Sequence, residues 1–163
     1  MDIQEQPLID QAPQAELFEN PVLVGTWLQL VRTFTRIHGR LEQVLARHAL
    51  TPPQFDVLAT LHLEEGITQQ ELARRLLVTK GNVCGLLDRM EGAGLIERRP
   101  DAIDRRINRI HLRSEGRERF RKTVPDHDAV LAGALAPLCD GDRLAIRALL
   151  SQIERATAEL APP

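Results

Sequence analysis

The sequence predicts a mainly α-helical protein with one small β-hairpin. Apolar residues recur every three or four positions in several segments, helix-capping residues precede most of these segments, and two short β-prone runs lie between Leu95 and Leu112. A chain of 163 residues fits one domain, or two fused subdomains, and is long enough to bury a core without disulfides or metal.

Composition argues against several protein classes. The two cysteines, Cys84 and Cys139, are far apart, and the five histidines form no ligand-like pair, so we expect no disulfide framework, metal or cofactor. No run approaches the roughly 18 apolar residues of a membrane span, so a cytoplasmic protein is expected. Residues 1–19 show no helical period and carry Pro7 and Pro13, which indicates a flexible N-terminal arm.

The first helix is expected from about residue 20 to 48. Trp27, Val31, Phe34 and other apolar residues recur on one face, and the length suits a supporting frame, so residues 20–50 are assigned to it. A second helix should begin at Thr51-Pro52-Pro53-Gln54, which combines a capping hydroxyl, a proline at the first helical position and an amide three residues after the cap.

Two short helices joined by a tight turn are expected between residues 68 and 93. Thr68-Gln69-Gln70-Glu71 is a capping box that begins a helix over about 69–75. After a break at Leu77-Val78, Thr79 can cap a helix to about Ala93, and Gly92 and Gly94 supply the left-handed conformation that helix ends favour. This arrangement is a helix–turn–helix.

A hairpin with a basic tip follows at 95–112, so the helix–turn–helix has a β-hairpin wing and residues 51–113 form one winged unit. Helix resumes near Ser114, and Pro125 should kink or break it. Asp140 can cap a last helix. Both ends of the chain carry wide apolar stripes with little protein left to cover them. Residues 20–50 and 114–160 are therefore expected to form a homodimer interface.

Charge is segregated along the chain. Residues 68–122 hold 14 Lys/Arg against 8 Asp/Glu, a net +6, whereas the remainder carries −8. A basic segment of this kind is typical of a surface that contacts phosphates. Together with the helix–turn–helix, it points to double-stranded DNA as the partner.

The start of the helix that begins after Thr79 is the expected major-groove contact. A helix about 10–12 Å wide fits that groove with its N-terminal residues on base edges. Asn82 can present an amide to adenine, Lys80 can meet phosphate or guanine, and Thr79 can donate to phosphate. The segment as a whole comprises Thr79, Lys80, Gly81, Asn82, Val83 and Cys84.

The wing tip carries Asp104, Arg105 and Arg106. A guanidinium on a narrow tip can enter the minor groove, where narrow A·T segments deepen the negative potential. Because Asp104 precedes Arg106 by two residues, its carboxylate can orient that side chain. We expect Arg106 to be the groove residue. Arg98 and Arg99 could equally well contact phosphates or simply keep an exposed strand soluble.

These motifs resemble the MarR family of bacterial transcription regulators. The run TQQELARRLLVTKGNVCGLLDRMEGAGLIERR is similar to that family's bracing helix, recognition helix and first strand, and DRRINRIHLRSEG is similar to its wing signature. The resemblance implies a dimer built from terminal helices, a pseudo-palindromic operator, repression, and release by a small phenolic or other anionic ligand. Two residues depart from the pattern: Arg113 replaces a usual Thr, which should move the helix cap to Ser114, and Cys84 replaces a usual Ser or Thr.

Other interpretations are kept open. The winged unit could dock another protein without binding DNA. Cys84 could make the regulator thiol-redox-responsive, although the cysteine of the family's oxidation-sensing branch has no counterpart in the first long helix. Trp27, Val31 and His38 could line an effector pocket, or simply pack in the core or a dimer interface. No catalytic motif is evident, so an enzyme is not expected.

Overall fold

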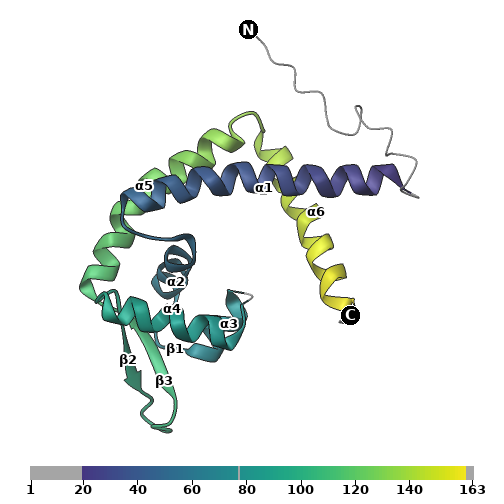
Figure 1. Cartoon of the computed structure of the whole chain (residues 1–163). Coiled ribbons are helices and arrows are strands. Elements are labelled where there is room, and N and C mark those ends of the chain that lie inside the picture. Colours follow the sequence, from purple (N-terminus) through teal and green to yellow (C-terminus); the bar gives the residue numbers. More distant parts are fainter. Residues whose placement is uncertain (1–19, 77, 161–163) are drawn as a thin grey trace. The chain divides into compact units, whose positions relative to one another are not determined.

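The computed structural model describes residues 20–76 and 78–160; the predicted arm at 1–19 and the predicted break at Leu77 lie outside them. The described residues fall into two compact units divided between Arg40 and Leu41, within the first helix. The elements in Figure 1 are α1 Pro21–Arg47, α2 Pro52–Leu63, β1 Ile67–Thr68, α3 Gln69–Arg75, α4 Lys80–Gly92, β2 Ile96–Pro100, β3 Asn108–Leu112, α5 Ser114–Leu135 and α6 Asp140–Glu159.

The helix starts predicted at Thr51, Thr68 and Thr79 are confirmed. At α2 the amide of Thr51 donates to Gln54 Oε1 at 2.9 Å, and at α3 the amide of Glu71 donates to Thr68 Oγ1 at 3.1 Å. At the end of α4 Gly94 adopts the left-handed conformation, with φ 71°, while Gly92 is still helical. Each cap satisfies an amide that the first turn leaves without a helical partner.

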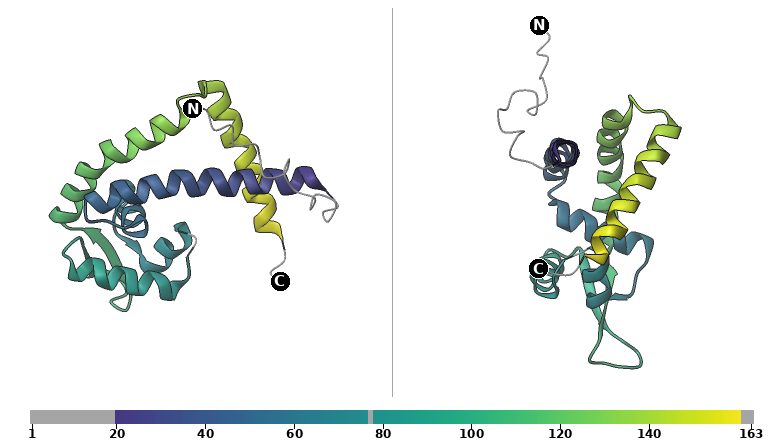
Figure 2. Two further views of the ribbon diagram at one scale, coloured as in Figure 1. Left: turned by 45° about the horizontal axis from the view of Figure 1, so that its top comes forward. Right: turned by 90° about the vertical axis from the view of Figure 1, so that its right-hand side faces the viewer.

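The predicted hairpin is confirmed, and it belongs to a three-stranded antiparallel sheet of order β1-β3-β2. Ile96 pairs with Leu112 and Pro100 with Asn108, and the connection between the strands projects beyond α4 in Figure 1 and in the right-hand view of Figure 2. β1 was not predicted, because two residues are too few for an alternating pattern. Its Ile67 lies opposite Ile110 in β3.

The core of the second unit lies where α2, α3 and α4 meet the sheet. Helix α2 contributes four buried side chains, those of Phe55, Val57, Leu58 and Leu61. Gly116 lets α5 approach the start of the hairpin, because a β-carbon there would lie 2.1 Å from the carbonyl oxygen of Leu95. The buried apolar cluster comprises Leu45, Leu50, Phe55, Val57, Leu58, Leu61, Ile67, Leu72, Ala73, Val83, Leu86, Leu87, Met90, Leu95, Ile96, Ile110 and Leu112.

Two expectations about the C-terminal helices need correction, and one is narrowed. Of the kink or break predicted at Pro125 the break does not occur, because α5 continues through this residue, although Pro125 has no amide to donate to the preceding turn. The cap of α5 is Arg113 rather than Ser114. The cap of α6 is Cys139 rather than Asp140, and its amide donates to Asp142 Oδ2 at 3.0 Å.

The apolar stripe of α6 is exposed along the helix, and none of the residues of α6 is buried. Leu144, Leu149, Leu150 and Ile153 are among its exposed side chains. Within the described ranges, no helix is both long enough and apolar enough to cross a membrane. The other described residues of the chain therefore leave this stripe uncovered.

Candidate nucleic-acid interface

The first turn of α4 presents a small, accessible surface. The hydroxyl of Thr79 accepts the amide of Asn82 at 3.4 Å, which caps the helix. Gly81, Asn82 and Cys84 are exposed. Apart from the two chain neighbours of Gly81 and the backbone of its own helix, no atom lies within 4 Å of the position that a β-carbon on Gly81 would take. Another backbone can therefore approach this turn closely. Lys80 begins α4, and its side chain lies outside what the structure describes.

Val83 does not belong to this surface. Its side chain is fully buried in the core cluster. This burial argues against a side-chain contact with DNA, and the DNA-contact assignment of Val83 stays a prediction. Its position three residues after Lys80 turns the side chain inward, and its contribution is to hold the first turn of α4 against the core.

The wing tip carries an exposed, oriented guanidinium. Arg106 donates from Nε to Asp104 Oδ1 at 3.0 Å and from Nη2 to Asp104 Oδ2 at 2.9 Å. The Arg106 side chain is still 90% exposed, and the hydrogen bonds with Arg106 lower the pKa of Asp104. The predicted orienting contact is therefore confirmed. Arg105 and Ile103, also at the tip, are exposed as well.

Asp101 shapes the turn of the wing. Its Oδ1 accepts the amides of Ile103 at 2.8 Å and Asp104 at 3.0 Å, and its Oδ2 accepts Nε of Arg109. The amide of Asp104, the guanidinium of Arg109 and the amide of Ile103 lower the pKa of Asp101 to about 2. Asp101 is buried, so the carboxylate acts as an internal support of the loop. Sequence patterns did not single it out.

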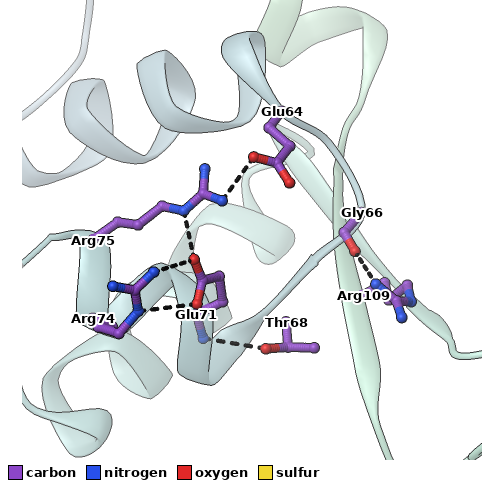
Figure 3. Close-up of polar contacts among 7 residues, drawn as sticks. All are labelled: Glu64, Gly66, Thr68, Glu71, Arg74, Arg75 and Arg109. Atoms are coloured by element: carbon purple, nitrogen blue, oxygen red, sulfur yellow. Dashed lines mark hydrogen bonds and ion pairs between the residues drawn. The ribbon is translucent and has the colours of Figure 1, made fainter.

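Arg109 ties the wing to the start of the helix–turn–helix. It donates from Nη1 to the carbonyl oxygen of Gly66 at 2.7 Å, a contact shown in Figure 3. Gly66 has φ 74°, the left-handed region that favours glycine. Because Arg109 also binds Asp101, the loop, strand β3 and the residue before β1 are joined through one side chain.

The arginines of α3 are paired within the helix–turn–helix. Figure 3 shows Glu71 accepting from both Arg74 and Arg75, at 2.7 and 2.8 Å, while Arg75 also reaches Glu64 at 2.7 Å. The hydrogen bonds from Arg74 and Arg75 lower the pKa of Glu71 to about 2. The predicted capping box is therefore half-formed, because Thr68 caps the helix while the Glu71 carboxylate binds these arginines.

Arg98 of β2 reaches back to α4. Nη1 donates to Glu91 Oε2 and Nη2 to Asp88 Oδ1, both at 2.6 Å, and the Arg98 amide donates to Glu91 Oε1 at 2.9 Å. Only 17% of the side chain is exposed. Arg98 is therefore neither a simple strand solubiliser nor an open phosphate contact. No local pattern in the sequence predicts this contact, because it joins a strand residue to a helix through packing.

Internal pairing is common across the basic segment. In the described part of residues 68–122, Arg89 and Arg105 are the basic side chains without an ion-pair partner among described groups. The others pair with carboxylates, as Arg99 and Arg113 do with Glu97. The net charge of the segment therefore overstates the number of open cations. Arg105 and the braced Arg106 are the exposed cations at the tip.

The predicted effector residues lie on α1. Trp27 is 65% exposed and Val31 is also exposed, whereas His38 is half-buried and its ring lies 5.1 Å from that of Phe34. An effector site at these residues stays a prediction. Among the described side chains, no group of three His, Cys, Asp or Glu could hold a metal ion. Both Cys84 and Cys139 are free and exposed.

A family model described as MarR family matches residues 48–107. The chain is 29% identical over 154 residues to the HTH-type transcriptional regulator PecS of Dickeya dadantii, an alignment that covers 93% of this chain and 87% of PecS. The matched family segment contains the whole helix–turn–helix and the wing tip, the elements that present the surface described above.

Solved structures of similar fold include AbsC from Streptomyces coelicolor, described as a MarR family transcriptional regulator. It has a TM-score of 0.82 and 23% identity over 88% of this chain and 99% of AbsC. The transcriptional repressor CouR bound to a 23-mer DNA duplex has a TM-score of 0.70 and 26% identity, covering 87% of this chain and 96% of CouR. CouR from Rhodococcus jostii RHA1 bound to p-coumaroyl-CoA has a TM-score of 0.71 and 25% identity, covering 77% and 88%.

Proposed function

This chain belongs to the MarR family of transcriptional regulators, and from that premise we propose that it represses transcription by binding a pseudo-palindromic operator as a homodimer. The observation that carries the proposal is the wing tip, where Asp104 holds Arg106 by two hydrogen bonds and leaves its side chain 90% exposed. A cation held in one orientation at a narrow tip suits the minor groove, because few rotamers are lost on binding.

Within each subunit, α4 enters the major groove by its first turn. The exposed Asn82 offers an amide to base edges, while Gly81 leaves room for the duplex. Thr79 has its hydroxyl on the helix cap as an acceptor, so the hydroxyl hydrogen stays available to a phosphate oxygen. CouR, a repressor of similar fold, is bound to a DNA duplex, which supports this mode of action.

A homodimer supplies a second winged helix–turn–helix unit for the second half of the operator. The apolar side chains of α6, including Leu149 and Ile153, are exposed on the single chain, as is Trp27 of α1. Covering such stripes with a second copy removes apolar surface from water in both subunits. The two winged helix–turn–helix units would then bind half-sites about one helical turn, 10–10.5 bp, apart.

We propose that a small ligand releases the protein from its operator. CouR is bound to p-coumaroyl-CoA, a ligand that combines a phenol with anionic groups, and we expect an effector of phenolic or anionic character here. Trp27, Val31 and His38 are the candidate contacts on α1. A ligand that binds only when the two winged helix–turn–helix units of the dimer lie at one separation shifts the population away from the spacing that can bind DNA.

A gel-shift assay with the promoter next to the protein's own gene tests the proposal. We expect a complex that resists unrelated competitor DNA and weakens steeply as salt rises, since phosphate contacts release counterions. A protein-docking module would give no sequence-preferring complex. Binding that unrelated DNA competes away equally well would contradict a sequence-specific regulator, and selection of bound fragments from random DNA provides an independent search for the operator.

A further inference from the structure

Arg98 joins strand β2 of the wing to helix α4. Both terminal nitrogens of its guanidinium are used, one by Asp88 and the other by Glu91, and the amide of Arg98 also donates to Glu91. Glu91 thus accepts from the backbone and the side chain of one residue. The contact lies between the helix that presents Asn82 and the hairpin that presents Arg106.

The burial of Arg98 distinguishes it from an open cation. Its side chain is 17% exposed, whereas that of Arg99, the next residue on β2, is 61% exposed. Burial disfavours the charged guanidinium, but the bonds to Asp88 and Glu91 outweigh this effect and raise the pKa of Arg98. To contact a phosphate, the terminal nitrogens of Arg98 would have to break their bonds to two carboxylates. We therefore do not expect Arg98 to contact DNA directly.

The carboxylates are the informative part of the arrangement. Asp88 and Glu91 place negative charge on a helix that is proposed to lie in the groove of a polyanion. Long-range electrostatics alone predicts that removing either charge strengthens DNA binding. A geometric role predicts the opposite, because the loss of the contact lets the hairpin move relative to the helix.

We propose that Arg98, Asp88 and Glu91 form a clamp that fixes the wing at one angle to α4, so that the major- and minor-groove contacts meet the same half-site together. The clamp rests on the proposed function, since it needs a duplex that touches both elements. Arg98 is then a positioning residue that acts through Arg106 and the first turn of α4. A guanidinium suits this role, because its planar fork reaches two carboxylates where an ammonium offers a single point charge.

The first test is the operator affinity of Glu91→Gln, measured by gel shift with wild-type protein in parallel. The glutamine oxygen can still accept the Arg98 amide, so the backbone contact is kept while the charge pair is lost. We expect affinity to fall on the order of tenfold, the effect of losing a charge-assisted hydrogen bond. Glu97→Gln is the matched control. Glu97 lies on β2 beside Arg98, and its carboxylate pairs with Arg99 and Arg113 rather than with Arg98. The operator affinity of this variant should equal or exceed that of the wild type.

Substitution of Arg98 by lysine separates positioning from phosphate contact. Lysine keeps the positive charge, so a phosphate contact would be largely preserved in Arg98→Lys, whereas the clamp would lose one of its two carboxylates. We expect Arg98→Lys to weaken operator binding and Arg99→Lys to leave it within about twofold, since an exposed ion pair contributes little. Thermal unfolding of each variant shows whether the protein still folds.

A double-mutant cycle tests whether Arg98 acts through the wing. If it positions Arg106, then Arg98→Lys should cost much less affinity in an Arg106→Ala background, whereas independent contacts would add. A purely structural loss of stability would lower the unfolding midpoint without this coupling. Should Glu91→Gln fail to fold, Asp88→Asn decides, because the Asp88 side chain is 61% exposed.

The outcomes separate the two proposals. No operator complex with wild-type protein contradicts the proposed function itself. A wild-type complex that Glu91→Gln or Asp88→Asn strengthens or leaves unchanged overturns the clamp alone, as does additive behaviour of Arg98→Lys and Arg106→Ala.

Discussion

The Asp104 carboxylate holds the Arg106 guanidinium by two parallel hydrogen bonds, at 3.0 and 2.9 Å, and also accepts the Arg106 amide at 3.0 Å. Acid and base are two residues apart in a tight turn, so the pair is local and needs no other element. The guanidinium keeps donors for a ligand because it has five N–H groups. The wing tip is therefore organised before DNA arrives.

Arg106→Ala should lower operator affinity by about 5- to 150-fold, as expected for a groove contact of about 1–3 kcal/mol. Asp104→Asn should also weaken binding, though less, because the orientation of Arg106 is lost even as a negative charge is removed. Affinities by fluorescence anisotropy at several salt concentrations check both. An Arg106→Ala variant that binds as tightly as the wild type would contradict the minor-groove assignment.

Gly116→Ala should destabilise the fold. A β-carbon at this position would lie 2.1 Å from the Leu95 carbonyl oxygen, so α5 must shift away from the hairpin, at a cost of about 1–3 kcal/mol. Gly133→Ala, on the same helix with no atom within 4 Å of its β-carbon position, is the control and should stabilise by up to about 1 kcal/mol. Urea unfolding measures both, and equal midpoints for the two variants would refute the close-approach argument.

Ala49→Gly should stabilise the fold. Ala49 follows the end of α1 with φ 55°, in the left-handed region that costs a residue with a β-carbon roughly 1–2 kcal/mol. Glycine relieves this strain but adds freedom to the unfolded chain, so we expect a net gain of about 0.5–1 kcal/mol. Ala132→Gly, at an exposed site inside α5, should have the opposite sign. A lower unfolding midpoint for Ala49→Gly would be inconsistent with backbone strain at this position.

Acid should weaken the wing through Asp101. Its pKa falls from the ordinary 3.8 to about 2 in the folded protein, so its contribution to stability is complete above about pH 4 and is lost as the pH falls toward 2. The stability difference between wild type and Asp101→Asn should therefore shrink over that window. Urea titrations at pH 5, 4 and 3 measure it; a difference that stays constant would mean that the carboxylate is not preferentially ionised in the fold.

Charged substitutions on α6 should break the dimer. Leu149 and Ile153 lie one turn apart and are exposed on the single chain; aspartate at both positions would place charges in an apolar interface without partners. Multi-angle light scattering should give the mass of two chains for the wild type and of one for the double variant. Arg147, exposed on the same helix, offers a control in Arg147→Ala. A wild-type mass of one chain at micromolar concentration would contradict the dimer.

Local signals explain why most of the fold could be predicted. Capping threonines and periodic apolar residues place the limits of α3 and α4 within a residue or two, because each signal acts over a single turn. β1 was not predicted because its two residues pair only with a strand 43 positions away in sequence, Ile67 with Ile110. Long-range pairing leaves no local pattern.

The same distinction between local and long-range contacts applies to the candidate site. The contact between Asp104 and Arg106 could be predicted because it is local. The contacts from Arg98 to Glu91 and from Arg109 to Gly66 could not, because they depend on how the strands pack against their neighbours. Val83 is buried between the exposed Asn82 and Cys84, because one turn at a helix start carries both inward and outward positions.

Thr68 serves two elements at once: its backbone pairs with Arg109 in β3, and its hydroxyl caps α3. Fraying of this edge of the sheet would also uncap the helix that braces α4. Amide hydrogen exchange should accordingly show the β1–β3 pairing and the first turn of α3 opening as one cooperative unit, with a shared protection factor rather than two separate ones.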